Sequence, residues 1–590
     1  MKSRTGHIMA SKYWWVLLLL VLVAVNYLGT IVHGRLDLTK EKRYTLSETT
    51  KEILGSLEEP VQIDVFLKGD FPTKFRKLTN SVEEFLALLK DAKSTKLQYR
   101  FISPDDEIPE KAGVTYADSL KKMGALPINL KAQIKTGESS SFAYPFAILK
   151  YKNRQELITL FSVPALFSES GGSPEKVINS AEALLEFKFA KALDGIISES
   201  KPLIAYSIGN GEPQLGREIV NGAPVFRDGR TADLEYSLNQ NYNLFTFNLN
   251  RQAGIPDTFK VLLIVKPTLQ FTQDEKIKID QYVMRGGKVI FFIDNLIAEQ
   301  DSLRFDKETI AYDRDLNLTD QLFKYGVRIN TDLVMDLQCD FMPFVVGGNS
   351  DKPQFEFLKW NYYPLFESKE NHSINKNTGL VAGRFVNSID TIAAEGIRKT
   401  VLLSSSSKSR IISTPALISI NENRNAPEDI KYNKRDVPVA YLLEGQFTSL
   451  FRNRLAQSQL DTLKASGTAF IGKAQKESKI IVVADGDMVL NDISPKEGPL
   501  PMGMNFYTAG TQYEYQFANR NFLLNCLEYM VNKPGIIETR NKDIVLRLLD
   551  GPRVSEQKST WQFVNIALPV LVVILCGWIY QQIRKRKYAA

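Results

Sequence analysis

The sequence predicts an α/β protein with two or more α/β domains held between two transmembrane helices. Two uncharged apolar stretches, 13–32 and 563–580, lie near the two ends of the chain. Between them, short buried-strand patterns alternate with amphipathic helix patterns, as in open and mostly parallel sheets. The 590 residues are too many for one hydrophobic core. The segment between the apolar stretches is therefore predicted to divide into domains.

The apolar stretches are long enough to cross a membrane. Residues 13–32 begin YWWVLLLL after a short tail, 1–12, and twenty residues span about 30 Å of hydrocarbon. A cleaved signal peptide is the alternative, but its apolar core would be shorter and would end at small residues. Residues 563–580 are flanked by Trp561 and by the basic tail 581–590, which favours a membrane exit over a buried core helix.

The charge distribution predicts an orientation. Three basic residues precede the first predicted span, and four follow the second. These seven positive charges account for the whole net charge of +7, so the segment between the spans is formally neutral. A nucleic-acid-binding protein would concentrate basic residues on a folded face, so no nucleic-acid partner is expected. Basic flanks stay in the cytoplasm. Both termini are therefore predicted to be cytoplasmic, with the main body in the periplasm of a bacterial inner membrane.

The first periplasmic domain is predicted at 61–165, after a linker and first helix at 33–60. Ser47 is a candidate N-cap for that helix, and Thr49 with Glu52 offers a second possible capping box. A strand at 61–69, a helix at 75–93 and a strand at 96–104 form a β-α-β unit with parallel strands. Further strands are expected at 128–134, 144–151 and 155–161. The layout is thioredoxin-like, but the domain contains no cysteine, which excludes dithiol redox chemistry.

The second and larger α/β domain is predicted at 173–535. It opens with a helix over 173–194, in which proline occupies the first helical position. Strands are expected at 203–208, 243–249, 259–267, 288–294 and 478–484, and helices at 231–240, 272–287 and 519–531. This alternation predicts an open parallel sheet covered on both faces. The polar stretch 340–435 is interpreted as an insertion of loops and edge strands, and 536–561 as a linker.

Catalytic motifs are sparse. No GxxxxGK[ST] loop occurs, so the energy for any work must come from a partner. Of the three histidines, only His372 lies in the predicted folded part, where it is interpreted as an exposed loop residue. A histidine-containing zinc site has too few ligands. Outside the spans, Cys339 and Cys526 allow at most one disulfide. No cofactor is expected.

Two turns are candidate ligand or partner sites. Gly209, Gly211 and Glu212 follow a predicted strand, where α/β folds bind ligands, and Glu212 could act as a base. The alternative is a tight turn that needs positive φ. Asp485 and Asp487, with Asp492, follow another strand and could hold Ca²⁺ or Mg²⁺, but an Asx-turn is favoured. No catalytic, cofactor-binding or metal-binding residue is assigned.

The order of these segments resembles the family of GldG, a gliding-associated ABC-transporter component. The resemblance is carried by RLDLTKEKRYTLSETTKEIL (35–54), EEPVQIDVFLKGDFP (58–72), KPLIAYSIGNGEP (201–213), VVADGDMVLND (482–492) and NRNFLLNCLEYMV (519–531), and it covers nearly the whole chain. It implies an auxiliary ABC-transport domain with an amidotransferase-like or flavodoxin-like fold. Because no cysteine lies between residues 1 and 338, the amidotransferase chemistry should be absent.

The resemblance also implies partners: a membrane permease and a cytoplasmic ATPase, in a complex linked to gliding motility and type IX secretion in Bacteroidota. The first hypothesis is therefore a non-catalytic subunit, with the lipid bilayer and a periplasmic protein or glycan as further partners. The second hypothesis is a membrane-anchored glycan or solute receptor, or a sugar-acting enzyme, that uses the Gly209–Glu212 turn.

Overall fold

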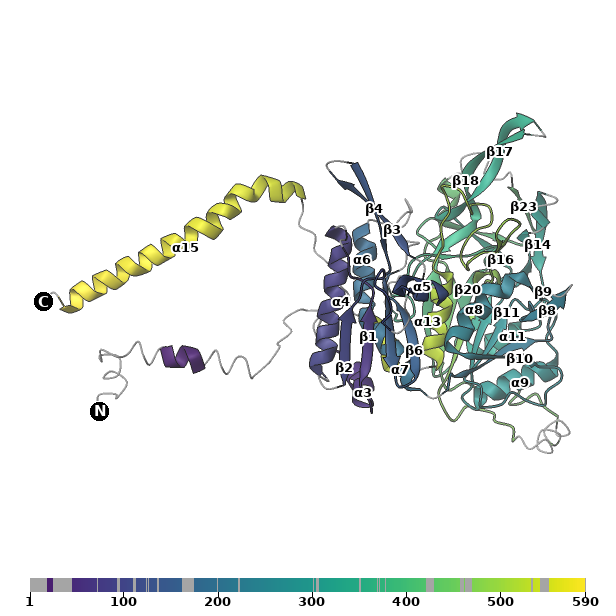
Figure 1. The fold of residues 1–590 in the computed structure, drawn as a ribbon. Coiled ribbons are helices and arrows are strands. Elements are labelled where there is room, and N and C mark those ends of the chain that lie inside the picture. The colour runs from purple at the N-terminus through teal and green to yellow at the C-terminus, as the bar shows by residue number, and fades with distance from the viewer. Residues whose placement is uncertain are drawn as a thin grey trace. The chain divides into compact units, whose positions relative to one another are not determined.

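We describe the fold from a computed structural model, which describes residues 19–24 and 45–588 apart from internal gaps. The longest gaps are 162–173, 421–428, 457–468 with Asp461 excepted, and 542–550. The chain divides into two compact units, residues 1–542 and 543–590 (Figure 1). Residues 19–24 of the predicted first span are helical, with exposed side chains. The rest of that span and the N-terminal tail lie outside the described residues.

The N-terminal sheet has the strand order β2-β1-β5-β6. Its strands are β1 (Val61–Val65), β2 (Leu97–Phe101), β5 (Phe146–Tyr151) and β6 (Arg154–Thr159). β1 and β2 are parallel and are joined by α4 (Thr73–Ala92), so the predicted β-α-β unit is confirmed. β5 and β6 add an antiparallel hairpin. A separate hairpin consists of β3 (Ile128–Ile134) and β4 (Gly137–Ala143).

Short helices complete this part of the chain. α3 (Glu48–Gly55) begins after Ser47, whose side chain accepts a hydrogen bond from the Thr50 amide, so the predicted N-cap is confirmed. The Thr49–Glu52 pair is not the cap. α5 (Tyr116–Lys122) begins with a capping box at Thr115 and Asp118. The single helix predicted at 173–194 is instead two helices, α6 (Pro174–Ala183) and α7 (Leu185–Ile197), because the backbone departs from helical dihedrals at Leu184, with φ −91° and ψ −2°.

The main sheet of the described chain contains seven strands in the order β10-β7-β11-β12-β25-β24-β21. The first five are parallel, and the last two add antiparallel strands at one edge. The strands are β7 (Leu203–Ile208), β10 (Asn243–Asn248), β11 (Val261–Val265), β12 (Lys288–Phe292), β21 (Ile397–Ser404), β24 (Pro438–Gly445) and β25 (Ser478–Val483). In chain order, the parallel strands run 2-1-3-4-5, the order of flavodoxin-like sheets.

Helices cover both faces of this sheet, as predicted. Alternate residues of the central strands belong to two separate hydrophobic clusters, because neighbouring side chains on a strand point to opposite faces. One face packs against α8 (Ala232–Asn241) and α13 (Asn519–Val531). The other packs against α9 (Gln273–Met284) and α11 (Thr319–Tyr325). α9 ends at Met284, close to the predicted end at residue 287, and Gly286 follows with φ +93°.

The stretch 340–435 is richer in strands than its polar composition predicts. β17 (Cys339–Asn349) and β18 (Lys352–Phe366) form a long antiparallel hairpin, and β17 lies at the edge of its sheet, so strands rather than loops occupy this part of the predicted loops and edge strands. Trp360 of this hairpin is fully buried in a separate cluster. β21 is an edge strand, as predicted. The remaining strands pair as β13 (Leu296–Ile297), β14 (Glu308–Asp313) and β23 (Ala416–Ser419); β15 (Val327–Ile329) with β20 (Ile389–Thr391); β16 (Asp332–Asp336) with β22 (Ser409–Ser413); and β18 with β19 (Val381–Ala382).

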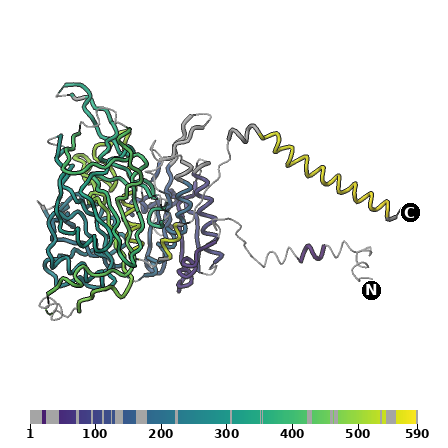
Figure 2. Tube along the Cα trace, turned by 180° about the vertical axis from the view of Figure 1, so that it is seen from behind, coloured from purple at the N-terminus to yellow at the C-terminus, as the bar shows by residue number. Residues whose placement is uncertain are grey.

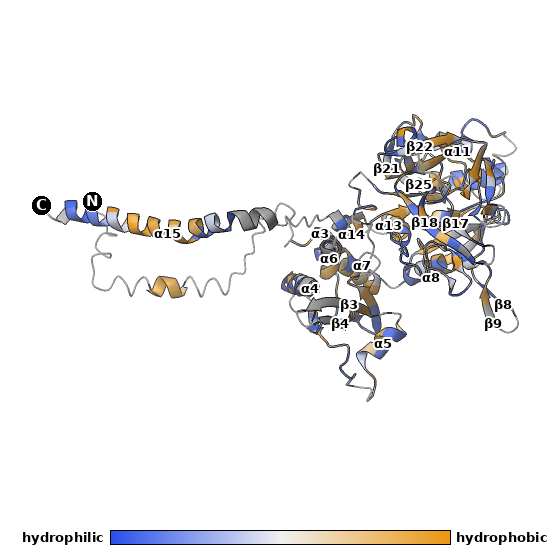
Figure 3. Cartoon of the chain, turned by 90° about the horizontal axis from the view of Figure 1, so that it is seen from above, coloured by the Kyte–Doolittle hydropathy of each residue, from blue (hydrophilic) through white to orange (hydrophobic). Residues whose placement is uncertain are grey.

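Smaller elements follow at the rim and at the C-terminus. Two short hairpins are β8 (Arg217–Val220) with β9 (Ala223–Phe226), and β26 (Ile493–Ser494) with β27 (Gly498–Pro499). α14 (Pro534–Glu538) follows α13. α15 (Gly551–Tyr588) makes up the second unit and begins earlier than the predicted span. Its residues 557–586 are long and apolar enough to cross a membrane, and Figure 3 shows this apolar stretch followed by a polar end.

Candidate functional site

Loops from four parallel strands meet at the carboxyl edge of the main sheet. The chain passes from β7 outward to β10 and then returns to β11 on the other side of β7. Open α/β sheets bind ligands outside the carboxyl ends of their strands, at such a reversal. The Gly209–Glu212 turn follows β7, and the Asp485–Asp487 loop follows β25. The structure therefore places both candidate turns at one edge.

The Gly209–Glu212 turn is fixed by close packing. Gly209 and Gly211 have φ of +124° and +78°, which favour glycine. A Cβ at Gly211 would lie 2.0 Å from the Thr268 hydroxyl oxygen. The backbone amides of Thr268 and Leu269 each donate to the Asn210 carbonyl at 2.8 Å. The loop after β11 is thus bonded directly to the turn after β7.

Glu212 holds this turn from within. Its side chain is buried, and its two carboxylate oxygens accept hydrogen bonds from the Ser207 hydroxyl at 2.8 Å and the Asn210 amide at 2.7 Å. Burial raises the pKa of Glu212, and these hydrogen bonds act in the opposite direction. One oxygen therefore has a partner in the turn, and the other has a partner in β7, the strand that precedes it.

Lys266 lies at the centre of a cluster of charged side chains at the carboxyl edge of the main sheet. Its ammonium nitrogen lies 2.6 Å from Asp487, 2.9 Å from Glu299 and 3.2 Å from Asp294. We call these four residues the Lys266 cage. Lys266 is only 3% exposed and has a φ of +44°, which is uncommon for a residue other than glycine. Burial acts to lower the pKa of Lys266, but the three carboxylates raise it above its ordinary value. The lysine is therefore held as an ammonium ion.

The carboxylates around Lys266 have the grouping of a possible metal site. Oxygens of Asp294, Asp485 and Asp487 lie within 4.8 Å of one another, and such oxygens are ligands for Ca²⁺ or Mg²⁺. The ammonium of Lys266, however, contacts two of the three carboxylates. Asp485 instead accepts hydrogen bonds from the Asp487 amide at 2.8 Å and the Met488 amide at 3.0 Å, as in an Asx-turn. The site therefore holds an internal cation in the place that a metal would need.

Asp492 lies apart from the other two aspartates predicted with it. The Arg384 guanidinium donates two hydrogen bonds to the Asp492 carboxylate, of 2.6 and 2.7 Å, in the bidentate geometry typical of arginine. The Asp492 carboxylate also accepts from the Phe506 amide at 2.8 Å. The three carboxylates Asp485, Asp487 and Asp492 are therefore not one ligand set, and Asp294 takes the place of Asp492.

A cavity of about 170 Å³ opens beside the cage. Its lining includes five charged side chains and one aromatic ring: Arg230, Glu299, Arg384, Asp487, Asp492 and Phe506. Each charged side chain has a partner of opposite charge, since Arg230 pairs with Asp228 at 2.9 Å and Glu299 also pairs with Arg314 at 2.7 Å. The charges on the cavity wall are thus neutralised within the chain.

Other residues considered from the sequence lie elsewhere. His372 is half-buried with its ring 5.0 Å from the Tyr529 ring, so the prediction of an exposed histidine is wrong. Burial lowers the pKa of His372. Cys339 and Cys526 are both free and buried.

Sequence reasoning named Asp487 of the cage and missed the other three members, Lys266, Asp294 and Glu299. Lys266 is the first residue after β11, in VLLIVK, and Asp294 is the second residue after β12, in VIFFID. A charged residue that directly follows a buried parallel strand is the signal that could have identified them, because such residues share one sheet edge.

Comparisons with known proteins show which protein families the chain matches. Residues 201–526, more than half of the chain, match the family described as "ABC-type uncharacterized transport system", and residues 40–150 match one described as a domain of unknown function. An "Uncharacterized protein" from Borreliella burgdorferi is 20% identical over 445 residues, covering 74% of this chain and 78% of its own.

Two solved structures are similar to parts of the chain. The mmIFT52 N-terminal domain is 12% identical with a TM-score of 0.28, covering 56% of this chain and 98% of that one. A putative ThuA-like protein from Parabacteroides merdae is 9% identical with a TM-score of 0.22, covering 59% and 94%. Both TM-scores are below 0.5, so we draw nothing from either likeness.

Proposed function

Because the chain belongs to the ABC-type uncharacterized transport system family, we propose that it is a non-catalytic, membrane-anchored accessory subunit of an ABC-type transporter. The observation that carries this proposal is the match over residues 201–526, which includes the whole parallel part of the main sheet. The chain has no GxxxxGK[ST] motif, so a separate ATPase would supply the energy.

The proposed membrane anchor is supported by α15. Its residues 557–586 are uncharged over most of their length and end in a basic run, which favours a cytoplasmic C-terminus. We extend the proposal to a second span at residues 13–32, with both termini in the cytoplasm and the main body in the periplasm. The three basic residues before residue 13 support that orientation.

The non-catalytic part of the proposal is supported by the carboxyl edge. A general base or nucleophile needs a reactive group that faces a substrate. Here Glu212 bonds to its own turn, and the charged groups around the cavity are paired with one another. The arrangement favours a site that maintains structure or binds a partner over one that reacts.

The proposed partners are a permease in the membrane and a cytoplasmic ATPase. We propose further, from the resemblance of residues 35–54 and 482–492 to the GldG family, that the complex serves gliding motility and type IX secretion in a member of the Bacteroidota. A periplasmic protein or glycan would then be the partner of the large body.

Co-purification tests this function. The tagged full chain is extracted in mild detergent from its native membrane, and the proteins retained with it are identified by mass spectrometry. A permease and an ATPase should be retained by the full chain and reduced for a matched variant that ends at residue 556, before the apolar part of α15. Repeated recovery of the full chain alone would overturn the proposal.

A second candidate function is a glycan or solute receptor that uses the Gly209–Glu212 turn. Its specific support is the position of the turn at the strand reversal beside β7. The Glu212→Gln variant keeps the size of the side chain and removes its charge. If this variant lost binding of a glycan from the native envelope while its melting temperature stayed unchanged, the receptor function would be favoured.

A further inference from the structure

The N-terminal end of the large unit is fastened to α7. The Ser47 amide and the Thr50 hydroxyl both donate to one carboxylate oxygen of Glu186, at 2.7 and 2.8 Å. Glu186 is only 3% exposed, and Leu54 of α3 is fully buried in the same hydrophobic cluster as Leu185 and Phe187 of α7. α3 is the first element described after residues 25–44, so this contact fixes the body where the chain enters it.

The C-terminal end of the same unit reaches the next residue of α7. The Arg540 guanidinium lies 5.0 Å from the centre of the Phe187 ring and contacts the Asn525 side chain on α13. Arg540 also donates to the Lys376 carbonyl at 3.0 Å. Only residues 542–550 separate this segment from α15. The two ends of the body are therefore held by Glu186 and Phe187, which are adjacent in the chain.

The two ends also touch each other. α14 packs so closely on α3 that a Cβ at Gly535 would lie 1.9 Å from the Thr49 hydroxyl oxygen. Ile536 and Ile537 of α14 are buried beside it. We call α3, α7 and α14 the chain-end seam. Figure 3 shows α14 beside α3 and α7, and Figure 2 shows a yellow-green segment of the C-terminal part beside the purple and blue elements of the first 200 residues, which agrees with these contacts.

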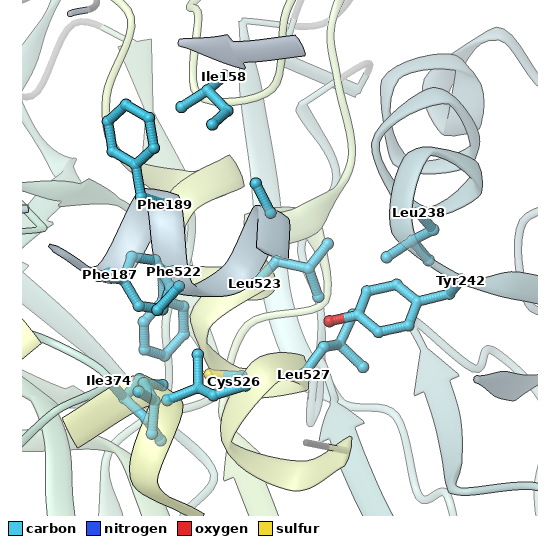
Figure 4. Packing of buried hydrophobic residues seen from close by; sticks show 14 of the residues in the cluster. Ile158, Phe187, Phe189, Leu238, Tyr242, Ile374, Phe522, Leu523, Cys526 and Leu527 are labelled. Carbon is cyan, nitrogen blue, oxygen red and sulfur yellow. The ribbon is translucent and has the colours of Figure 1, made fainter. Parts of the chain in front are cut away.

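α7 joins this seam to the rest of the unit. Its Phe189 ring lies 5.5 Å from Phe85 of α4, and its Lys191 pairs at 3.0 Å with Glu528 of α13. Figure 4 shows Phe187 and Phe189 of α7 packed with Phe522, Leu523 and Cys526 of α13 in one hydrophobic cluster. α7 thus connects α4, which joins two strands of the N-terminal sheet, to the helix that covers one face of the main sheet.

α13 continues the connection to the carboxyl edge. At its first residue, the Asn519 side chain donates to the Met488 carbonyl at 2.9 Å and to the Ala382 carbonyl at 2.8 Å. Met488 directly follows Asp487 of the Lys266 cage, and its amide donates to Asp485. A helix of 13 residues is about 20 Å long, so α13 spans the distance from the seam to the cage loop.

We propose that α7 and α13 form a rigid lever that couples the chain-end seam to the Asp485–Met488 loop. A displacement of the chain-end seam would reach Glu186 or Phe187, pass to α13 through their shared core, and shift the loop that Asn519 holds. The inference rests on the proposed function, because it takes both chain ends to be anchored in a membrane next to a moving permease. Interfaces of packed side chains transmit such shifts because they deform little.

Native cysteines provide the test. Cys526 lies in the core of α13, whereas Cys339 lies in the separate cluster around Trp360. The full chain carrying Cys576→Ser is reconstituted in nanodiscs, and alkylation of both buried thiols is followed by mass spectrometry. Hydrogen exchange of residues 485–490 is measured in parallel. Loosening of the seam should expose Cys526 and the loop together and leave Cys339 protected.

Two variants loosen the seam from opposite ends. In Gly535→Ala, the added methyl group pushes α14 away from α3, and the rate of Cys526 alkylation should rise about tenfold or more. Thr49→Gly combined with Gly535→Ala makes room for the methyl group and should restore protection. Ser47→Ala removes the cap of α3 and should raise the rate about fivefold. Its matched control is Thr115→Ala, which removes the cap of α5 and should leave both Cys526 and the loop unchanged.

The results separate this inference from the proposed function. If Ser47→Ala and Thr115→Ala acted equally, or if Cys339 reacted in parallel with Cys526, the loosening would be global and the lever would be rejected. The lever would also be rejected if Cys526 became reactive while exchange of residues 485–490 stayed unchanged. All these outcomes are independent of whether a permease and an ATPase co-purify with the chain.

Discussion

Replacing Lys266 with methionine tests whether the cage holds the carboxyl edge together. The substitution keeps a long unbranched side chain and removes the ammonium ion. Asp487 and Asp294 then lose the cation that lies 2.6 and 3.2 Å away, whereas Glu299 keeps Arg314 at 2.7 Å. Two carboxylates whose side chains are only 12% and 16% exposed are thereby left without that partner.

The expected loss follows from this geometry. Removing one partner of a buried ion pair destabilises a protein by about 3–5 kcal/mol. If residues 201–526 unfold as one unit, their unfolding entropy is about 0.7 kcal/mol/K, so the melting temperature should fall by about 4–7 °C at pH 8. Burial raises the pKa of Asp294 to about 6, and loss of the ammonium raises it further. At pH 5.5 the loss should shrink to about half, because the protonated carboxyl no longer needs a counter-ion.

Thermal unfolding of the full chain in detergent, followed by intrinsic fluorescence, gives the measurement. Lys260→Met is the matched control, since Lys260 is exposed at the opposite end of β11. In a second arm, Lys266→Ala leaves the carboxylates of Asp294, Asp485 and Asp487 within 4.8 Å of one another and opens space between them. Millimolar Ca²⁺ or Mg²⁺ should then raise the melting temperature of this variant and leave the wild type unchanged. If Lys266→Met melted within 1 °C of the control, the cage would have no stabilising role.

Three further predictions concern the turn, the pH dependence and the anchors. Gly211→Ala should destabilise the chain by about 1–3 kcal/mol more than Gly216→Ala. Both glycines have positive φ, but only at Gly211 would the added Cβ clash, 2.0 Å from the Thr268 hydroxyl oxygen. Equal melting temperatures of the two variants would contradict this clash. Burial raises the pKa of Asp340 to about 6 and of Glu156 to about 7, so the folded chain keeps protons that the unfolded chain releases near pH 4. The melting temperature should therefore rise as the pH is lowered from 8 to 6, and it should rise less steeply in Asp340→Asn. A melting temperature that stayed constant over this range would contradict the raised pKa values of the two buried carboxyls. A chain that ends at residue 542 should stay in the membrane after carbonate extraction if residues 13–32 form a span, and its release would remove the first anchor from the proposal.

The sequence predicts the elements of the main sheet well because their burial is strong and local. VLLIV and VIFF are continuous apolar runs, and the observed strands β11 and β12 coincide with them to within a few residues. Such runs are typical of parallel strands covered on both faces. Ser47 was also predictable as a cap, because capping depends on residues within one helical turn.

The stretch 340–435 shows where composition misleads. Averaged over nearly a hundred residues, its many polar residues indicate loops, yet β21 ends in the buried run Leu402–Ser404 and pairs with β24 in the main sheet. β18 carries Trp360, Tyr362 and Tyr363 into a separate core. Antiparallel strands with one exposed face need only alternate apolar residues, so an average over a long window hides them.

The candidate site is harder to predict because its bonds join distant parts of the chain. Lys266 and Asp487 are 221 residues apart, and Thr50 and Glu186 are 136 apart. Periodicity assigns a residue to a strand or a helix, but it does not say which strands are neighbours. Once the order β7-β11-β12-β25 is known, the residues that end those strands must share one edge, and Lys266, Asp294 and Asp485 follow from the sequence itself. Strand order is therefore the missing information. The chain-end seam needs more than this order, because α3, α7 and α14 lie outside the main sheet and meet through side-chain packing that no repeat or motif in the sequence encodes.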